Sequence, residues 1–251
     1  MLCSSGLRFT ARIGGVPADV FVVVGFELTE TLSSPFRLTL DLASYNPDLV
    51  LTDLLEQPTE LTVWQDRTPR RRFAGVVAEA SRGDSGHRRS RYQVIVKPPW
   101  WRLELVHACR MFQAQATDTI LRGLLAERGV TRTRFDLRRP PAVREYCVQY
   151  RESDLAFVHR LAAEEGWHYR IDATDGRPAL VIADHHGNAP HLAPAPYNAH
   201  TGGSIRQPAV FQFHHHRRVR ATSVVLQDYT FKKPRLYPVA CANRRRSSPT
   251  G

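Results

Sequence analysis

Apolar and polar residues alternate most strictly between residues 36 and 42, where Phe36, Leu38, Leu40 and Leu42 are separated by polar positions. This period of two is typical of a half-buried β-strand. Looser alternation at residues 61–64, 73–78 and 92–97 predicts three more strands, with turn-rich pieces at 66–70 and 81–89 between them. Several strands within the first hundred residues predict a small β-barrel or sandwich.

A short helical turn and a pair of prolines interrupt this β-rich part. Asn46 offers a helix cap before the apolar run at residues 49–55, and Pro58 would stop that run, so we predict one or two helical turns. Pro98 and Pro99 lack the backbone N–H that a strand needs, and they end the strand before them. We therefore place a domain boundary after residue 97.

Two amphipathic helices are predicted in the middle third, because apolar residues recur there at helical spacing. The first begins at Thr117 and ends at Gly129, a residue suited to a left-handed cap. The second begins after Ser153 as N-cap, with Asp154 near the positive end of the helix dipole, and ends before Gly166. Their apolar faces comprise Ile120, Leu121, Leu124 and Leu125 in the first helix and Leu155, Val158, Leu161 and Ala162 in the second.

After the second helix the pattern returns to β. Trp167, Tyr169 and Ile171 alternate, and they predict a strand that pairs with residues 179–183 through a turn at residues 175–176. We further predict a Pro- and Gly-rich linker at residues 187–203 and strands at residues 210–213 and 221–229. Residues 236–251 show no periodicity, and we predict no regular structure there.

The formal net charge of +11 raises the alternative of a nucleic-acid-binding protein. Of the 35 basic residues, 32 are arginine, because only Lys97, Lys232 and Lys233 are lysine. The arginines are spread along the chain and are not interleaved with the aromatic residues that single-strand binders use for stacking, so this alternative ranks low.

The four cysteines show no C-x-x-C spacing and predict cytosolic thiols, with neither a zinc site nor a disulfide framework. The longest apolar run near the N-terminus, residues 20–24, is too short for a signal peptide. We expect synthesis in the cytoplasm.

The segment Gln149–Leu161, followed by Glu164, Glu165 and Gly166, closely resembles the most recognisable stretch of the VgrG family of type VI secretion spike proteins. Five further pieces stand in the order that this family shows, at residues 33–36, 73–77, 99–103, 111–120 and 226–234. Each piece is a cap, a turn, a strand entry or an aromatic packing element, so the set specifies a shape and not a reactive centre.

The resemblance implies a mixed β protein similar to the hub of contractile phage tails, with a β-barrel, an α/β subdomain and the start of a second β-barrel. It implies a homotrimer that sits on the inner tube, contacts the baseplate and serves effector delivery. The hub of a contractile phage tail or tailocin is the alternative. The implied domains are a first barrel at 1–97, an α/β subdomain at 98–200, an incomplete second barrel at 201–235 and a non-homologous basic tail at 236–251.

Longer relatives continue into an oligonucleotide-binding-fold neck and a β-helix needle, and neither pattern follows here. We hypothesise a truncated family member, produced by a frameshift after Pro234, and expect the chain alone to be unstable or poorly trimeric because a half-built barrel exposes strand edges. The expected location is the cytoplasm at synthesis and then the secretion apparatus.

Four sets of residues have types that could support catalysis, metal binding or ligand binding. The tetrad Gly83–Gly86 has the letters found around a serine-protease nucleophile, but a turn is the simpler interpretation. The adjacent Glu164 and Glu165 cannot face each other across a cleft as glycosidase carboxylates do. Trp100 and Trp101 are interpreted as packing residues at a domain boundary.

Two histidine groups, His185 with His186 and His191, and His214 with His215 and His216, lack the spacing of a zinc site and are interpreted as loop or edge residues. We therefore assign no catalytic, cofactor-binding or metal-ligating residue. The sequence predicts a structural protein that is not an enzyme and uses no cofactor or small-molecule substrate.

Overall fold

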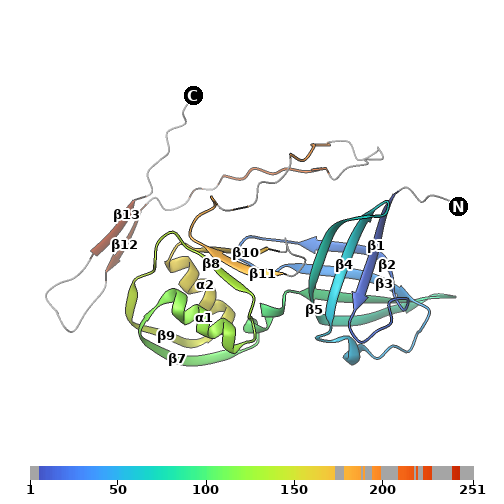
Figure 1. Ribbon diagram of the computed structural model, residues 1–251, viewed down its shortest axis with the longest axis horizontal. Coiled ribbons are helices and arrows are strands. Elements are labelled where there is room, and N and C mark those ends of the chain that lie inside the picture. Colours follow the sequence, from blue (N-terminus) through green and yellow to red (C-terminus); the bar gives the residue numbers. More distant parts are fainter. Residues whose placement is uncertain are drawn as a thin grey trace. The chain divides into compact units, whose positions relative to one another are not determined.

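The computed structural model describes residues 6–172, 178–187, 189, 194–198, 209–217, 219, 223–227 and 239–243 (Figure 1). The chain divides into two compact units, Met1–His191 and Leu192–Gly251. The first unit contains two hydrophobic cores, one inside a curved antiparallel sheet and the other between helices and short strands.

Six strands form the curved sheet, in the order β1-β4-β5-β6-β3-β2 (Figure 1). They are β1 Leu7–Ile13, β2 Val22–Thr29, β3 Arg37–Ser44, β4 Pro58–Gln65, β5 Thr68–Ser85 and β6 Ser90–Lys97. In the described residues no ladder joins β1 to β2, yet the rings of Phe9 and Phe26 on these two edges lie 5.2 Å apart. The predicted barrel is thus a curled half-barrel.

The strand predicted from the strict alternation at residues 36–42 is confirmed as β3, and its apolar side chains lie in the core of this sheet. Leu38, Leu40 and Leu42 of β3 have no exposed surface, and Tyr92, opposite Leu42 on β6, is 2% exposed. Successive strand residues point to opposite faces, so these apolar side chains meet inside the curl.

The prediction of a turn over residues 81–89 is wrong for residues 81–85, which belong to β5 and pair with β6 as far as Ser85 opposite Ser90. Residues 81–85 are exposed and polar, so no apolar alternation marks them, but the hydrogen bonds of β6 keep them extended. Strands β1 and β2 were also not predicted.

The predicted helical turn near residue 50 is confirmed as a 3-10 helix, Leu51–Leu54, but its predicted cap is wrong. Asn46 Oδ1 accepts the N–H of Asp48 (2.9 Å) in a local turn, and Val50 precedes the helix without a side-chain cap. Pro98 and Pro99 end β6 as predicted, and a second 3-10 helix, Pro99–Glu104, follows.

The α/β part comprises a two-stranded ribbon, two helices and a three-stranded sheet (Figure 1). Its elements are β7 His107–Ala116, α1 Thr117–Glu127, β8 Thr133–Asp136, β9 Val143–Ser153, α2 Asp154–Glu164, β10 His168–Asp172 and β11 Ala179–Ala183. Both predicted helices are confirmed. The hydroxyl of Ser153 accepts the N–H of Ala156 (3.1 Å), and Gly129 and Gly166 end the helices with φ of +73° and +72°.

Strands β10 and β11 form the predicted antiparallel hairpin, whose turn at residues 175–176 lies outside the described residues. Strand β8, which was not predicted, pairs with β11 in parallel.

Reciprocal hydrogen bonds join the curved sheet to the α/β part. The N–H of Ser33 donates to the carbonyl of Tyr169 (3.0 Å), and the N–H of Tyr169 donates to the hydroxyl of Ser33 (3.2 Å). The Tyr169 ring packs edge-on against Trp100 at 5.2 Å, and Trp100 is 5% exposed. The predicted packing role of Trp100 is confirmed.

The second unit contains an antiparallel pair, β12 Ser223–Gln227 and β13 Val239–Asn243. The strand predicted at 221–229 is confirmed at 223–227, and the rest of it, with most of the 226–234 motif, lies outside the described residues. The strand predicted at 210–213 is wrong, because only Val210 forms an isolated bridge, with Tyr197. We expected no regular structure at 236–251, and this expectation is wrong for the residues of β13. The five residues of β13 do not alternate between apolar and polar side chains, so no local pattern indicated a strand.

Gly75 and Gly123 supply a matched test of the packing. A Cβ at Gly75 would lie 2.5 Å from the carbonyl oxygen of Lys97, whereas a Cβ at Gly123, on the exposed side of α1, would meet nothing within 4 Å. We expect Gly75→Ala to destabilise the protein by about 1–3 kcal/mol through overpacking. Gly123→Ala should stabilise it by about 0.5–1 kcal/mol, because glycine disfavours a helix interior. Urea unfolding of both variants checks this, and shifts of the same sign would contradict it.

Candidate functional site

One side of the β7–β9 ribbon exposes an aligned set of large apolar side chains. Tyr146, Val148 and Tyr150 alternate along β9 and share one side of the strand, and Met111 of β7 lies opposite Val148. The exposed fractions of these four residues lie between 46% and 65%. We call this set the ribbon face. Contiguous exposed apolar residues of this kind mark interaction sites in soluble proteins.

The other side of the ribbon rests on the helices. Phe112 of β7 stacks on Phe157 of α2 with ring centroids 5.7 Å apart, and Cys147 of β9 is 5% exposed. A ribbon of only two strands needs such support, because an isolated hairpin is marginally stable in water. Because successive side chains of a strand point to opposite sides, one set of side chains lies in the core and the ribbon face is exposed.

A buried carboxylate fixes the ribbon to both helices. Asp154, the first residue of α2, has no exposed surface and accepts hydrogen bonds from Arg128 Nε (2.7 Å) and Gln149 Nε2 (2.8 Å). Arg110 of β7 places a second guanidinium 3.8 Å from the same carboxylate. Asp154 thus ties α2 to β7, to β9 and to the end of α1. The sequence analysis assigned it only to the helix dipole.

A second set of ionic contacts holds the opposite end of α2. Arg144 of β9 donates to Thr117 Oγ1 (2.8 Å), Glu164 Oε2 (2.5 Å) and Glu165 Oε1 (2.7 Å). Arg160 of α2 also reaches Glu164, at 3.2 Å. The two acidic residues at the end of α2 would oppose the helix dipole, and these guanidinium groups compensate for that.

The environment of Glu165 keeps this carboxylate charged. Burial opposes the charged form, but hydrogen bonds from Thr117 and Arg144 outweigh burial and lower the pKa of Glu165. The adjacent carboxylates therefore have structural partners and do not face each other across a cleft.

None of the remaining sequence candidates belongs to the set of residues that forms the ribbon face. Ser85 of the protease-like tetrad shares a hydrogen bond with Ser90 (2.8 Å) on the neighbouring strand. The rings of His214 and His216 stack at 5.9 Å in the second unit, His185 contacts Asp184, and His191 lies outside the described residues. In the described ranges, no three His, Cys, Asp or Glu side chains group as metal ligands.

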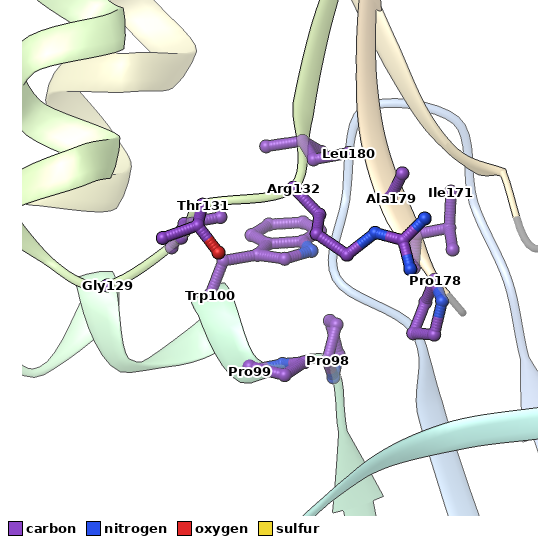
Figure 2. Close-up of a pocket in the computed structure, with 11 residues that line it drawn as sticks. Pro98, Pro99, Trp100, Gly129, Thr131, Arg132, Ile171, Pro178, Ala179 and Leu180 are labelled. Carbon is purple, nitrogen blue, oxygen red and sulfur yellow. The ribbon is translucent and has the colours of Figure 1, made fainter.

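A small apolar pocket lies where the curved sheet meets the α/β part (Figure 2). Pro98, Pro99 and Trp100 form one side of it, and the Arg132 side chain extends across it from the other (Figure 2). Its volume of about 160 Å³ is well below the several hundred Å³ typical of sites for small organic ligands. The pocket is thus too small for an organic cofactor.

Comparison with known proteins identifies the family. The family model described as phage tail baseplate hub (GPD) matches residues 29–250. The chain belongs to the phage tail baseplate hub family. The match includes residues 236–250, for which the sequence analysis found no resemblance.

Curated relatives of this hub-family chain are spike proteins. It is 37% identical over 238 residues to type VI secretion system spike protein VgrG3 of Vibrio cholerae, covering 91% of this chain and 23% of that one. It is 36% identical over 238 residues to the actin cross-linking toxin VgrG1 of the same species, covering 91% and 22%. The chain thus spans less than a quarter of the length of these two relatives.

A solved structure supports the hub-like fold. A component of the type VI secretion system of E. coli, titled as similar to T4 bacteriophage tail proteins gp27 and gp5, has a TM-score of 0.64 and 22% identity. The alignment covers 88% of this chain and 56% of that one. The fold class predicted from the sequence, a hub-like mixed β protein with an α/β insertion, is confirmed. In the described part of the chain, no helix is long and apolar enough to cross a membrane.

The ribbon face was missed by the sequence analysis of this hub-family chain. The alternation of Tyr146, Val148 and Tyr150 was present in the sequence, but neither β7 nor β9 was predicted as a strand. Residues with positive φ, Ala114 at +51° and Arg151 at +52°, interrupt the regular pattern in each strand. This local alternation was the signal that could have located the site.

Arg144→Lys tests the ionic support of the ribbon. Lysine keeps the charge but cannot direct three hydrogen bonds, so we expect a loss of about 1–3 kcal/mol in the free energy of unfolding. Arg37→Lys, at an exposed pair with Glu79 (3.7 Å), should change it by less than about 0.5 kcal/mol.

The pH dependence of stability adds a second measurement. Because the pKa of Glu165 is lowered in the folded protein, its contribution to stability is present at neutral pH and is lost as the pH falls through that lowered pKa. Arg144→Lys should make this acid-induced loss smaller. Urea unfolding at neutral and acidic pH measures both effects, and an unchanged acid dependence would show that Arg144 does not stabilise the charged carboxylate.

Proposed function

We propose that this chain is a structural hub of the type VI secretion spike, which assembles as a trimer on the inner tube for effector delivery. The observation that carries the proposal is the ribbon face, an apolar surface supported on its inner side by a packed core. A cyclic trimer uses heterologous contacts, in which two different surfaces of each subunit meet. The ribbon face supplies one apolar surface for such a contact.

The curved sheet offers a second surface. Strand β4 pairs with β5 only as far as Val76, so the later residues of β5, through Ser85, have a ladder partner in β6 alone. Open strand edges readily pair with another chain. We propose that the ribbon face and this open edge of β5 are the contact surfaces toward neighbouring subunits or the tube.

Function as an assembly module agrees with the relatives, which are named as spike proteins. Actin cross-linking is named for one relative, and this chain matches only 22% of that protein. We propose no enzymatic role for the present chain. The hub of a contractile phage tail is the second candidate, since the matching family model carries that description.

Co-expression with the inner tube protein of the same apparatus tests the proposal. We expect the purified complex to contain three copies of this chain by light scattering. Tyr146→Ser with Tyr150→Ser should reduce the recovered complex at least about tenfold, because aromatic residues dominate such interfaces. Leu32→Ser with Leu105→Ser removes two similarly exposed apolar residues, 61% and 63% exposed, and should leave recovery unchanged.

A chain that elutes as a monomer with no tube protein would overturn the proposed function. Equal losses in the two double variants would instead overturn the role of the ribbon face. Circular dichroism of each variant verifies that the fold is retained.

A further inference from the structure

A polar cleft in the α/β part lies beside the loop that joins β8 to β9. Its volume is about 480 Å³, and its lining includes Arg138, Arg139, Trp167, Asp184 and His185. The cleft shares no residue with the ribbon face, and none of the sequence motifs predicted it as a site.

The carboxylate of Asp184 fixes the loop at this cleft. It accepts the backbone N–H groups of Arg138 (3.0 Å) and Arg139 (3.2 Å), and it contacts His185 Nδ1 at 2.8 Å. The backbone hydrogen bond from Arg138 and the bond from His185 lower the pKa of Asp184 to about 2, so this carboxylate stays charged at neutral pH. The two arginines are therefore held by their backbone, and their side chains remain available.

The acidic groups of the cleft are already bound to other donors. Asp184 binds the loop backbone and His185, and Glu165 binds Arg144 and Thr117. In contrast, no ion pair or hydrogen bond engages the guanidinium group of Arg138 or Arg139 in the part of the chain that the structure describes. The Arg138 guanidinium lies close to Gly187. Among the described residues, the guanidinium groups of the two arginines that line the cleft thus have no ionic or hydrogen-bonding partner.

We propose that this cleft binds an acidic segment of a partner protein, whose carboxylates the guanidinium groups of Arg138 and Arg139 receive. A guanidinium group presents its N–H donors in a planar fork that matches a carboxylate. Pro140 and Pro141 follow the arginines and restrict the loop, so less freedom is lost on binding. Asp184 acts as a positioning residue, because it orients the loop without contacting the ligand.

The charged and aromatic residues of the cleft favour a peptide over a nucleic acid as its ligand. Nucleic-acid binders follow several successive phosphates with cations and stack bases on exposed aromatic faces. This cleft offers two arginines, and its aromatic residue, Trp167, is 7% exposed and buried against Phe135. A short acidic segment needs only one or two carboxylates at one place, which is what the cleft can accommodate.

Fluorescence anisotropy with a labelled oligoglutamate peptide tests this inference on the full chain. Arg138→Gln with Arg139→Gln should weaken binding at least about tenfold, because hydrogen bonds between charged groups contribute that much. Arg88→Gln with Arg91→Gln removes the same charge from exposed positions of the β5–β6 hairpin and should change binding less than about twofold in physiological salt. Asp184→Asn should weaken binding while both cations remain.

Further probes separate the outcomes. An oligoglutamine peptide should not bind, and a single-stranded DNA oligonucleotide should not compete at equal concentration. Equal losses in the two arginine double variants would overturn the site as mere surface charge. Loss of DNA binding through Arg138 and Arg139, with tighter binding of DNA than of the peptide, would overturn the choice of ligand. The cleft variant should keep the trimer with the tube protein, so failure here is distinguishable from failure of the proposed function.

Discussion

The buried carboxylate of Asp154 holds the segments that shape the ribbon face. It binds Arg128 at 2.7 Å and Gln149 at 2.8 Å with no exposed surface, so removing either partner would leave a buried charge with fewer hydrogen bonds to compensate its burial. Arg144 at the other end of α2 adds a second fixed point. The ribbon therefore cannot turn its apolar side inward, because its inner side is already packed and bonded. The outward position of Tyr146 and Tyr150 follows from this constraint.

Much of the fold could be predicted where burial imposes a clear period. The fully buried leucines of β3 and the two capped helices were located because alternation, helical spacing and cap residues agree there. Strands β7 and β9 were missed because exposed apolar residues and positive-φ positions interrupt their pattern. Strand β1 was missed although residues 7–13 alternate between apolar and polar side chains. The polar end of β5 was mistaken for a turn, since only pairing with β6 keeps it extended.

The candidate sites were less accessible from the sequence than the fold. The ribbon face depends on the strand register that places Met111 opposite Val148. The cleft depends on hydrogen bonds between Asp184 and a loop about 45 residues earlier in the chain. Neither contact follows from a local sequence pattern. Glu164 and Glu165 were considered from the sequence as candidate catalytic carboxylates, whereas the structure shows both bound to Arg144. The family resemblance predicted the fold, whereas the ribbon face and the cleft are identified only by contacts between residues that are distant in the sequence.

The central claim is that the ribbon face is an assembly surface. A cryo-electron microscopy map of the assembled spike, resolved to side chains, tests it most directly. We expect the rings of Tyr146 and Tyr150, 57% and 65% exposed in the single chain, to be buried against a neighbouring chain. Both rings facing solvent in the assembled particle would contradict it.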